Sequence, residues 1–166
     1  VKILEQDIFM LNNRKISDFR RKSIGFVFQF YNLVQNLTVK ENILLPLIMD
    51  GKSTKDYEKR LQETLEIVGL TDKQDFYSTQ LSGGQQQRVA IARSIINKPK
   101  IIFADEPIGN LDSVTGNAVM ELFRSICKEE EITIFQVTHS RESALYGHRI
   151  VNMKDGVIDS EEIVEC

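Results

Sequence analysis

A serine followed by two glycines opens a stretch with the pattern of a helix. Ser82, Gly83 and Gly84 precede residues 85–97, where apolar side chains recur near helical spacing. A helix that starts on glycines leaves its first backbone N–H groups free, and its dipole makes that end positive, so the stretch predicts a seat for a phosphate group. Ser82 can cap the helix and also donate to an anion. The alternative is an ordinary capped helix after a glycine turn.

Two carboxylates directly follow an apolar strand. Residues 101–104 are wholly apolar, as expected for a strand in a sheet that is covered on both faces, and Asp105 and Glu106 come next. A second apolar strand, residues 132–137, ends just before His139. A helix is predicted between the two strands, and in such a βαβ unit the strands run parallel. Because their carboxyl ends then share one edge, the two carboxylates and His139 are expected to lie side by side.

The helix between these strands is expected to start at its cap, Asp112, and to close at residues 129–131. Its apolar stripe is predicted at positions i, i+4, i+8 and i+12, which are Val114, Ala118, Leu122 and Ile126. Ser140 is expected to start a further short helix after the second strand.

These residue types at a strand edge suit phosphoryl transfer. An Asp at the end of a buried strand is the usual magnesium anchor of nucleotide hydrolases, and a neighbouring Glu can polarise a water for attack on a γ-phosphate. In-line transfer needs mainly positioning and charge stabilisation, so one carboxylate for the metal and one for the water suffice. We therefore expect Asp105 at the metal and Glu106 at the water, with His139 donating a hydrogen bond to the γ-phosphate.

A third short apolar strand, residues 24–28, precedes Gln29. A glutamine at a strand end can simply cap a loop. It can also orient a water or reach a metal-bound phosphate, and the strand alone leaves both interpretations open.

Residues 38–97 have the composition of a helical insertion carried by an α/β core. Residues 38–41 form a capping box, and Pro46 is expected to end or kink the first helix. The next helix is expected to start at residue 53 or 54, with Gly69 as the residue that follows its end. Its buried face is predicted to carry Tyr57, Leu61, Leu65 and Val68.

Residues 51–54, Gly-Lys-Ser-Thr, match only the tail of a phosphate-binding loop. The first glycine of such a loop would have to stand at Pro46, and residues 47–50 contain no glycine. The segment also follows a helix rather than a strand. We predict that Gly51 forms a turn before a capped helix.

The two ends of the chain carry weaker signals. Residues 1–3 are expected to end a strand, and residues 18–22 to form a charged, solvated helical surface. Asp155-Gly156 is a strong hairpin signal between residues 149–153 and 157–160.

Composition limits the function. The length of 166 residues suits one domain, and a net charge of −3 gives no support for a nucleic-acid surface. Cys127 and Cys166 lack metal-ligand spacing. No apolar run approaches the roughly 18 residues of a membrane span, so any membrane role is expected to come through a partner.

Together, five ordered motifs resemble those of the nucleotide-binding domain of an ATP-binding cassette (ABC) transporter. Residues 81–85 are similar to the signature, Gln29 to the Q-loop glutamine, residues 101–106 to the Walker B strand, residues 109–112 to the D-loop, and His139 to the switch histidine. The details of residues 26–29, 41–43 and 105–116 look most like the branch that serves lipoprotein release, macrolide export and antimicrobial-peptide resistance.

The resemblance implies an α/β, P-loop NTPase-like fold with a parallel sheet. Residues 1–37 and 98–166 would form the core, and residues 38–97 an inserted helical subdomain that carries the signature. In this family two such domains pair head to tail, with each ATP between the phosphate loop of one and the signature of the other. The helical subdomain would face transmembrane permease subunits, which places the protein in the cytoplasm, peripherally at the inner face of the membrane.

By the same resemblance, the cofactors would be ATP and Mg²⁺. Asp105 and Gln29 would act at the metal, Glu106 as the base, and His139 and Gln29 as further catalytic residues. The nucleotide would be contacted by Ser82, Gly83, Gly84, Gln85 and Asp112, and Asp112 would also communicate across the dimer.

This sequence departs from the family pattern in three ways. The phosphate-binding loop (Walker A) and the aromatic residue that stacks on adenine are absent, since the family places them well upstream of Gln29. Ser140 stands where the family commonly has Asp, and Ile108 where this branch commonly has Thr. We therefore expect an N-terminally incomplete ABC domain, inactive by itself, from a parent protein that is an ATPase.

Two other functions share part of this pattern. A non-catalytic remnant would act only by docking to a partner, although the retained Asp105, Glu106, Ser82 and His139 favour a catalytic lineage. A DNA-maintenance ATPase of ABC type would share the signature and Walker B strand. Those enzymes carry long heptad-bearing coiled coils and basic DNA-contact runs, which this sequence lacks.

Overall fold

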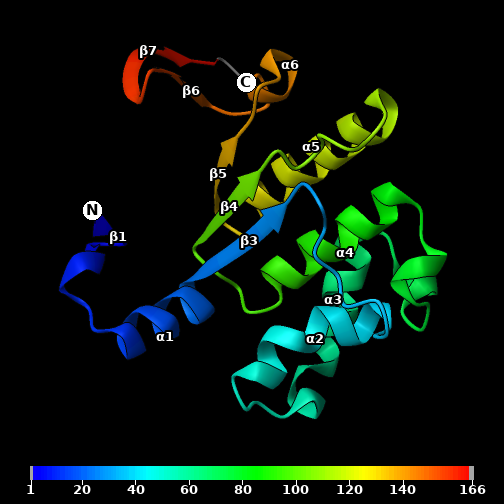
Figure 1. The fold of residues 1–166 in the computed structure, drawn as a ribbon. Helices are drawn as coiled ribbons and strands as arrows, with labels where there is room; N and C mark the ends of the chain where they lie inside the picture. The colour runs from blue at the N-terminus through cyan, green and yellow to red at the C-terminus, as the bar shows by residue number, and fades with distance from the viewer. Residues whose placement is uncertain (1, 165–166) are drawn as a thin grey trace.

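A three-stranded parallel sheet forms the centre of the computed structural model, which describes residues 2–164. Its order is β3 (Ile24–Phe28), β4 (Ile101–Asp105) and β5 (Thr133–Val137). Phe28 pairs with Asp105, and Asp105 pairs with Val137, so the three strands end at one edge (Figure 1). The predicted parallel βαβ unit is confirmed.

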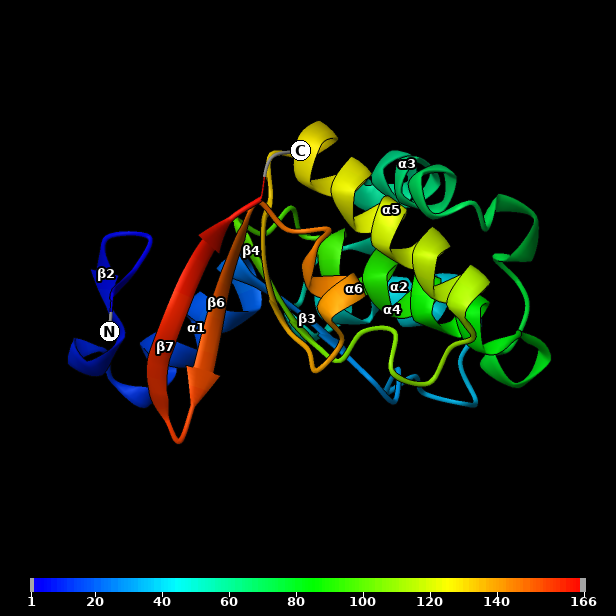
Figure 2. The ribbon, with the colours of Figure 1, turned by 90° about the horizontal axis from the view of Figure 1, so that it is seen from above.

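Four helices lie on one side of this sheet (Figures 1 and 2). They are α2 (Val39–Met49), α3 (Glu58–Val68), α4 (Gly83–Ile95) and α5 (Ser113–Glu129). Their buried apolar side chains meet Val27, Ile102 and Ala104 of the strands in one hydrophobic core. This core fixes where the carboxyl ends of the strands stand relative to α4 and α5.

The opposite face of the sheet carries a row of aromatic rings. The Phe26 and Phe103 ring centroids lie 5.9 Å apart, and those of Phe103 and Phe135 lie 5.7 Å apart. Phe135 is 57% exposed, and the Arg20 guanidinium covers the ring of Phe26. The expectation of a sheet covered on both faces is therefore wrong for the described residues. An apolar strand can be buried on both faces, but its sequence does not show that other elements cover both of them.

The remaining elements lie outside the central sheet and these four helices. They are β1 (Lys2–Ile3), β2 (Gln6–Asp7), α1 (Asn13–Ser23), α6 (Arg141–Ala144), β6 (Arg149–Lys154), β7 (Val157–Ile163) and 3-10 turns at Ile8–Met10, Thr54–Tyr57, Thr71–Lys73 and Ser78–Gln80. Within the described residues no helix is both long and apolar enough to cross a membrane. Val1 and Cys166, which enter two of the expectations above, lie outside the described residues.

Most local signals are confirmed. Capping boxes open α2 at Thr38 and α4 at Ser82, and Asp112 and Ser140 cap α5 and α6. Gly69 ends α3 in the left-handed conformation, with φ +65°. Further confirmed features are the turn at Gly51, the helix over residues 18–22 and the hairpin at Asp155-Gly156.

The first two helices of the insertion differ from expectation at their ends. Pro46 lies inside α2, which continues to Met49, because Leu47 is fully buried and the Asp50 N–H donates to the carbonyls of Pro46 and Leu47. The next helix starts as a 3-10 turn, becomes α-helical at Glu58 and has no side-chain cap.

The predicted stripe of α5 is wrong at its start. Val114 is 79% exposed and Ala118 is exposed, whereas Ile126 is buried. A strict i+4 spacing drifts around a helix of 3.6 residues per turn, so its members cannot all share one face. The buried face instead consists of Gly116, Val119, Met120, Phe123 and Ile126, at successive steps of three, one, three and three residues.

Candidate active site

Two carboxylates and a histidine meet at the carboxyl edge of the sheet. Asp105 is the exposed last residue of β4, and Glu106 follows it. The Glu106 carboxylate accepts hydrogen bonds from the His139 backbone N–H at 2.6 Å and from the Thr138 hydroxyl at 3.2 Å. The His139 ring, 98% exposed, lies with Nε2 3.8 Å from Glu106 Oε1. The predicted juxtaposition of these residues is therefore observed.

The backbone at Glu106 is in the left-handed region, with φ +43°. This conformation costs a non-glycine residue on the order of 1–2 kcal/mol. It is held because the Glu106 N–H donates to the Val137 carbonyl at 2.9 Å and its carbonyl accepts from Gly109 at 3.0 Å. Backbone and side chain together fix the carboxylate in place.

Gln29 lies one residue beyond the register pair of Phe28 and Asp105. Its Nε2 donates to Asn110 Oδ1 at 3.2 Å, and Asn110 Nδ2 donates to the Gln29 carbonyl at 3.0 Å. Sequence reasoning missed this pairing, because the two residues stand 81 positions apart.

Side chains at the amino end of α4 accept hydrogen bonds from backbone N–H groups of the same helix end. Ser82 Oγ accepts from the Gln85 N–H at 3.4 Å, and Gln85 Oε1 accepts from the Ser82 N–H at 2.9 Å. A Cβ on buried Gly84 would stand 2.2 Å from Thr115 Cγ2, and one on Gly83 would stand 2.9 Å from the Tyr31 hydroxyl. Close packing thus explains Gly84, whereas the atom nearest Gly83 is the movable end of the Tyr31 side chain. The phosphate seat stays a prediction.

Asp112 caps α5 directly. Its Oδ1 accepts from the N–H groups of Val114 at 3.1 Å and Thr115 at 3.0 Å. Hydrogen bonding by the Thr115 side chain and backbone lowers the pKa of the Asp112 carboxyl. The residue is ionised at neutral pH and has a structural task of its own.

A buried amide ties α4 to the loop after Glu106. Gln87 is fully buried, and its Nε2 donates to the Pro107 carbonyl. Sequence reasoning missed this residue as well, since nothing in a glutamine-rich helix start marks one amide as buried.

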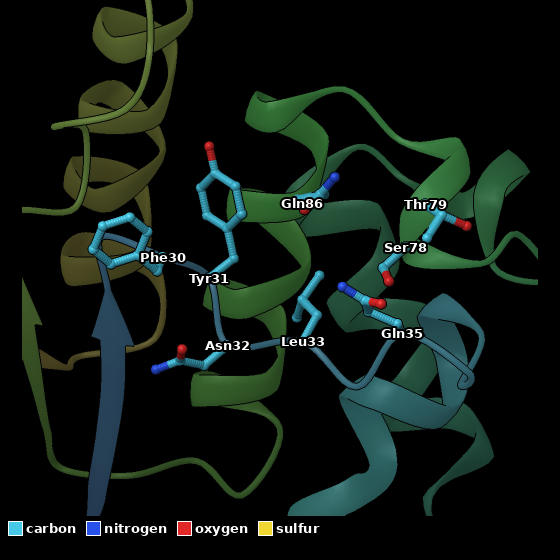
Figure 3. Close-up of a pocket in the computed structure, with 8 residues that line it drawn as sticks. All are labelled: Phe30, Tyr31, Asn32, Leu33, Gln35, Ser78, Thr79 and Gln86. Atoms are coloured by element: carbon cyan, nitrogen blue, oxygen red, sulfur yellow. The ribbon is translucent and has the colours of Figure 1, made fainter.

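A pocket of about 260 Å³ opens beside the segment that follows Gln29. In Figure 3, Leu33 and Gln35 of this segment stand near Ser78, with Tyr31 pointing along α4. Tyr31 and Asn32 have left-handed backbone angles, φ +52° and +50°, and the Arg93 guanidinium donates to both carbonyls, at 2.9 and 2.7 Å. Burial lowers the pKa of Arg93.

The donor set at the sheet edge fits a hard cation. Mg²⁺ takes oxygen ligands and is commonly held by one or two protein groups together with substrate phosphates and waters. Asp105 offers an exposed carboxylate and Gln29 an amide oxygen. The described residues contain no cluster of three or more acidic, histidine or cysteine side chains placed to bind a metal.

Known proteins resemble this chain in sequence. Residues 1–109 match the model of the ABC transporter family. The chain is 50% identical, over 89% of its length, to an uncharacterised ABC transporter ATP-binding protein of Methanocaldococcus jannaschii, and it spans only 64% of that relative. It is 44% identical, over 95% of its length, to the lipoprotein-releasing system ATP-binding protein LolD of Cytophaga hutchinsonii, of which it covers 72%. Proteins named for macrolide export also match it.

A solved structure extends the likeness to the fold. The ATP-binding cassette MJ0796, determined as a dimer in a post-hydrolysis state with ADP and Pi, superposes with a TM-score of 0.84 at 40% identity. The match covers 99% of this chain and 72% of that one. The fold is thus the α/β, P-loop NTPase-like fold of ABC ATPase cassettes. The chain belongs to the ABC transporter family, in the branch that includes lipoprotein-releasing and macrolide-export relatives.

Proposed function

We propose that this chain is the ATP-binding and ATP-hydrolysing part of a subunit that energises an ABC-type membrane transporter, for export or extraction. The observation that carries the proposal is the Glu106 carboxylate, fixed by the His139 N–H at 2.6 Å beside the exposed Asp105. Relatives named as ATP-binding proteins of lipoprotein release and macrolide export support the transport role.

In this proposal each site residue has one task. Asp105 and the Gln29 amide oxygen hold Mg²⁺, which supplies charge stabilisation to the phosphates. Glu106 accepts the proton of the attacking water at its carboxylate, and His139 donates a hydrogen bond to the γ-phosphate.

The nucleotide contacts of the signature act across a dimer interface. Two copies pair head to tail, and the amino end of α4, with Ser82, Gly83, Gly84 and Gln85, faces the γ-phosphate bound to the other copy. Asp112 communicates between the two copies across that interface. The dimeric state of the related cassette MJ0796 supports this arrangement.

The partner of the helical block, residues 38–97, is a transmembrane permease subunit. The pocket beside residues 30–35 lies where that block meets the segment after Gln29, so a permease segment seated there would move both together (Figure 3). The protein would then sit in the cytoplasm against the inner face of the membrane. We further propose that these 166 residues alone, without a phosphate-binding loop, do not hydrolyse ATP.

The test replaces one carboxylate in the full-length protein. Glu106→Gln is expected to lower kcat for ATP hydrolysis by about 10²–10³-fold while ATP affinity stays within twofold, because the base is lost and the binding groups remain. Glu121→Gln, the same change on the exposed face of α5, is the control. Unchanged turnover in Glu106→Gln would remove Glu106 from the base role. Calorimetric titration of the 166-residue chain with Mg-ATP is expected to show no binding, and tight binding would contradict its inactivity.

The two alternatives predict different results. A docking remnant would show no ATP turnover in the full-length protein before any substitution. A DNA-maintenance ATPase would show turnover that DNA stimulates, whereas the transport proposal expects stimulation by the permease in lipid.

A further inference from the structure

Gln29 and Asn110 form a reciprocal pair at the carboxyl edge of the sheet. Gln29 Nε2 donates to Asn110 Oδ1 at 3.2 Å, and Asn110 Nδ2 donates to the backbone carbonyl of Gln29 at 3.0 Å. One asparagine side chain thus contacts the main chain and the side chain of the same glutamine. Such a pair restrains the side-chain torsions of Gln29 as well as its position.

The pairing also decides which way the Gln29 amide faces. A carbonyl can only accept, so the Gln29 main-chain oxygen requires the amide nitrogen of Asn110. Asn110 Oδ1 is then the atom turned to Gln29, and Nε2 is the atom of the Gln29 amide that can donate to it. Oε1 of Gln29, which lies across Cδ from Nε2 in the same amide plane, is therefore directed away from Asn110. The oxygen, which is the atom a hard cation prefers, is the one that stays available.

Gly109 makes room for this orientation. A Cβ at Gly109 would lie 2.8 Å from Gln29 Nε2 and 3.1 Å from Cδ. The approach is closer than a methyl group allows, so the amide of Gln29 rests directly on the Gly109 backbone. Asn110 thus acts on the Gln29 side chain through hydrogen bonds. Gly109 acts on it because it has no Cβ in the space that the amide occupies.

We propose that Asn110 is a positioning residue for Gln29, which orients the glutamine amide with Oε1 toward the metal, and that Gly109 is needed for the same orientation. The inference rests on the proposed function for the identity of the cation. Outer partners that orient metal ligands typically change metal affinity or activity by about 10–100-fold when they are removed.

The pairing is tested first by NMR of the 166-residue chain without nucleotide. The Gln29 side-chain amide protons are expected to show a through-space contact with the Gly109 α-protons. Asn110→Leu keeps the side-chain bulk and removes both hydrogen bonds, so the contact should disappear. Asn110→Asp keeps the acceptor for Nε2 and should retain it, and Gly109→Ala should displace the amide by a separate route. Asn152→Leu and Gly147→Ala are matched controls: Asn152 lies on the hairpin, and a Cβ at Gly147 meets nothing closer than 3.4 Å.

The consequence is tested by the Mg²⁺ dependence of ATP turnover in the full-length protein. Asn110→Leu and Gly109→Ala are expected to raise the half-saturating Mg²⁺ concentration by about 10-fold, while the two controls leave it unchanged. An NMR contact that persists in Asn110→Leu overturns the inference. So does a lost contact with an unchanged Mg²⁺ requirement, since the pair would then be only structural. Failure of the proposed function shows separately, as unchanged turnover in Glu106→Gln.

Discussion

The Glu106 carboxylate is bound to the backbone N–H of His139 at 2.6 Å, and this bond joins the ends of the two strands β4 and β5. The side chain of Glu106 thereby holds the loop that carries the His139 ring, and that loop in turn holds the carboxylate. The left-handed backbone at Glu106, φ +43°, directs the carboxylate to that loop. The geometry of each residue therefore depends on the other.

The strained backbone predicts an unusual order of stability for substitutions at residue 106. Glu106→Ala and Glu106→Gly both lose the carboxylate, but only Gly tolerates φ +43° without cost. Glu106→Gly is expected to be more stable than Glu106→Ala by about 1 kcal/mol, although Gly is normally the worse residue. Urea denaturation of the two variants measures the difference. A more stable Ala variant would show that the backbone relaxes out of the left-handed region.

The contact between Gly84 and Thr115 predicts a rescue. A Cβ at Gly84 would stand 2.2 Å from Thr115 Cγ2, so Gly84→Ala forces α4 and α5 apart and is expected to cost about 1–3 kcal/mol. Thr115→Ser removes the offending methyl group, and the double variant should recover most of the loss. Gly147→Ala serves as the control for an unhindered glycine. Equal unfolding free energies of the single and double variants would place the strain elsewhere.

A buried ion pair connects three helices. The Arg60 guanidinium of α3 donates to both Glu130 oxygens at 2.9 Å, just after α5, and to the Ile95 carbonyl at 3.1 Å at the end of α4. Removing one partner leaves a charge without its counterion, so Arg60→Met is expected to cost about 3–5 kcal/mol. The double change Arg60→Met with Glu130→Leu should cost much less than the sum of the two single changes.

An exposed pair provides the comparison for Arg60 and Glu130. Arg149 and Glu161 are 59% and 44% exposed, against 10% and 14% for the buried pair. Glu161→Gln is expected to change the unfolding free energy by less than about 1 kcal/mol. Similar losses of unfolding free energy in Glu161→Gln and Arg60→Met would show that burial does not strengthen the pair. Urea denaturation of Arg60→Met, Glu130→Leu, their double variant and Glu161→Gln measures these losses.

The Asp112 cap predicts a pH dependence. Its folded pKa is lowered by hydrogen bonds from Thr115, so the unfolded chain takes up a proton first as the pH falls below about 3.9. The contribution is therefore complete at pH 7 and is lost as the pH falls through the folded pKa. Asp112→Asn keeps an acceptor but cannot ionise. The difference in unfolding free energy between the native chain and this variant should stay constant from pH 7 to pH 5 and shrink below pH 4. A difference that is independent of pH would show that charge adds nothing to the cap.

The features predicted from sequence are those that depend on neighbours in the chain. Thr38, Ser82 and Asp112 cap their helices through residues two or three positions away, so a short motif contains all the partners. The sheet edge was predictable for a related reason, because parallel pairing alone brings Asp105 and His139 together.

The missed features are those that join distant positions. Arg60 with Glu130, Gln29 with Asn110 and Gln87 with Pro107 are pairs 70, 81 and 20 residues apart, and no pattern within either segment points to its partner. The buried face of α5 was missed because several stripes fit the same apolar residues. Only the position of the sheet decides which stripe faces inward.

The helical block leaves β3 at the carboxyl edge of the sheet and returns to β4, the adjacent strand, at the amino edge. These two crossings are not the only connections, because buried side chains of α4 pack with Val27 and Ile102 in one hydrophobic core. A displacement of the block is therefore passed to β3 through α4 as well as through the chain. Gln29 directly follows β3, so it lies where that displacement reaches the carboxyl edge of the sheet.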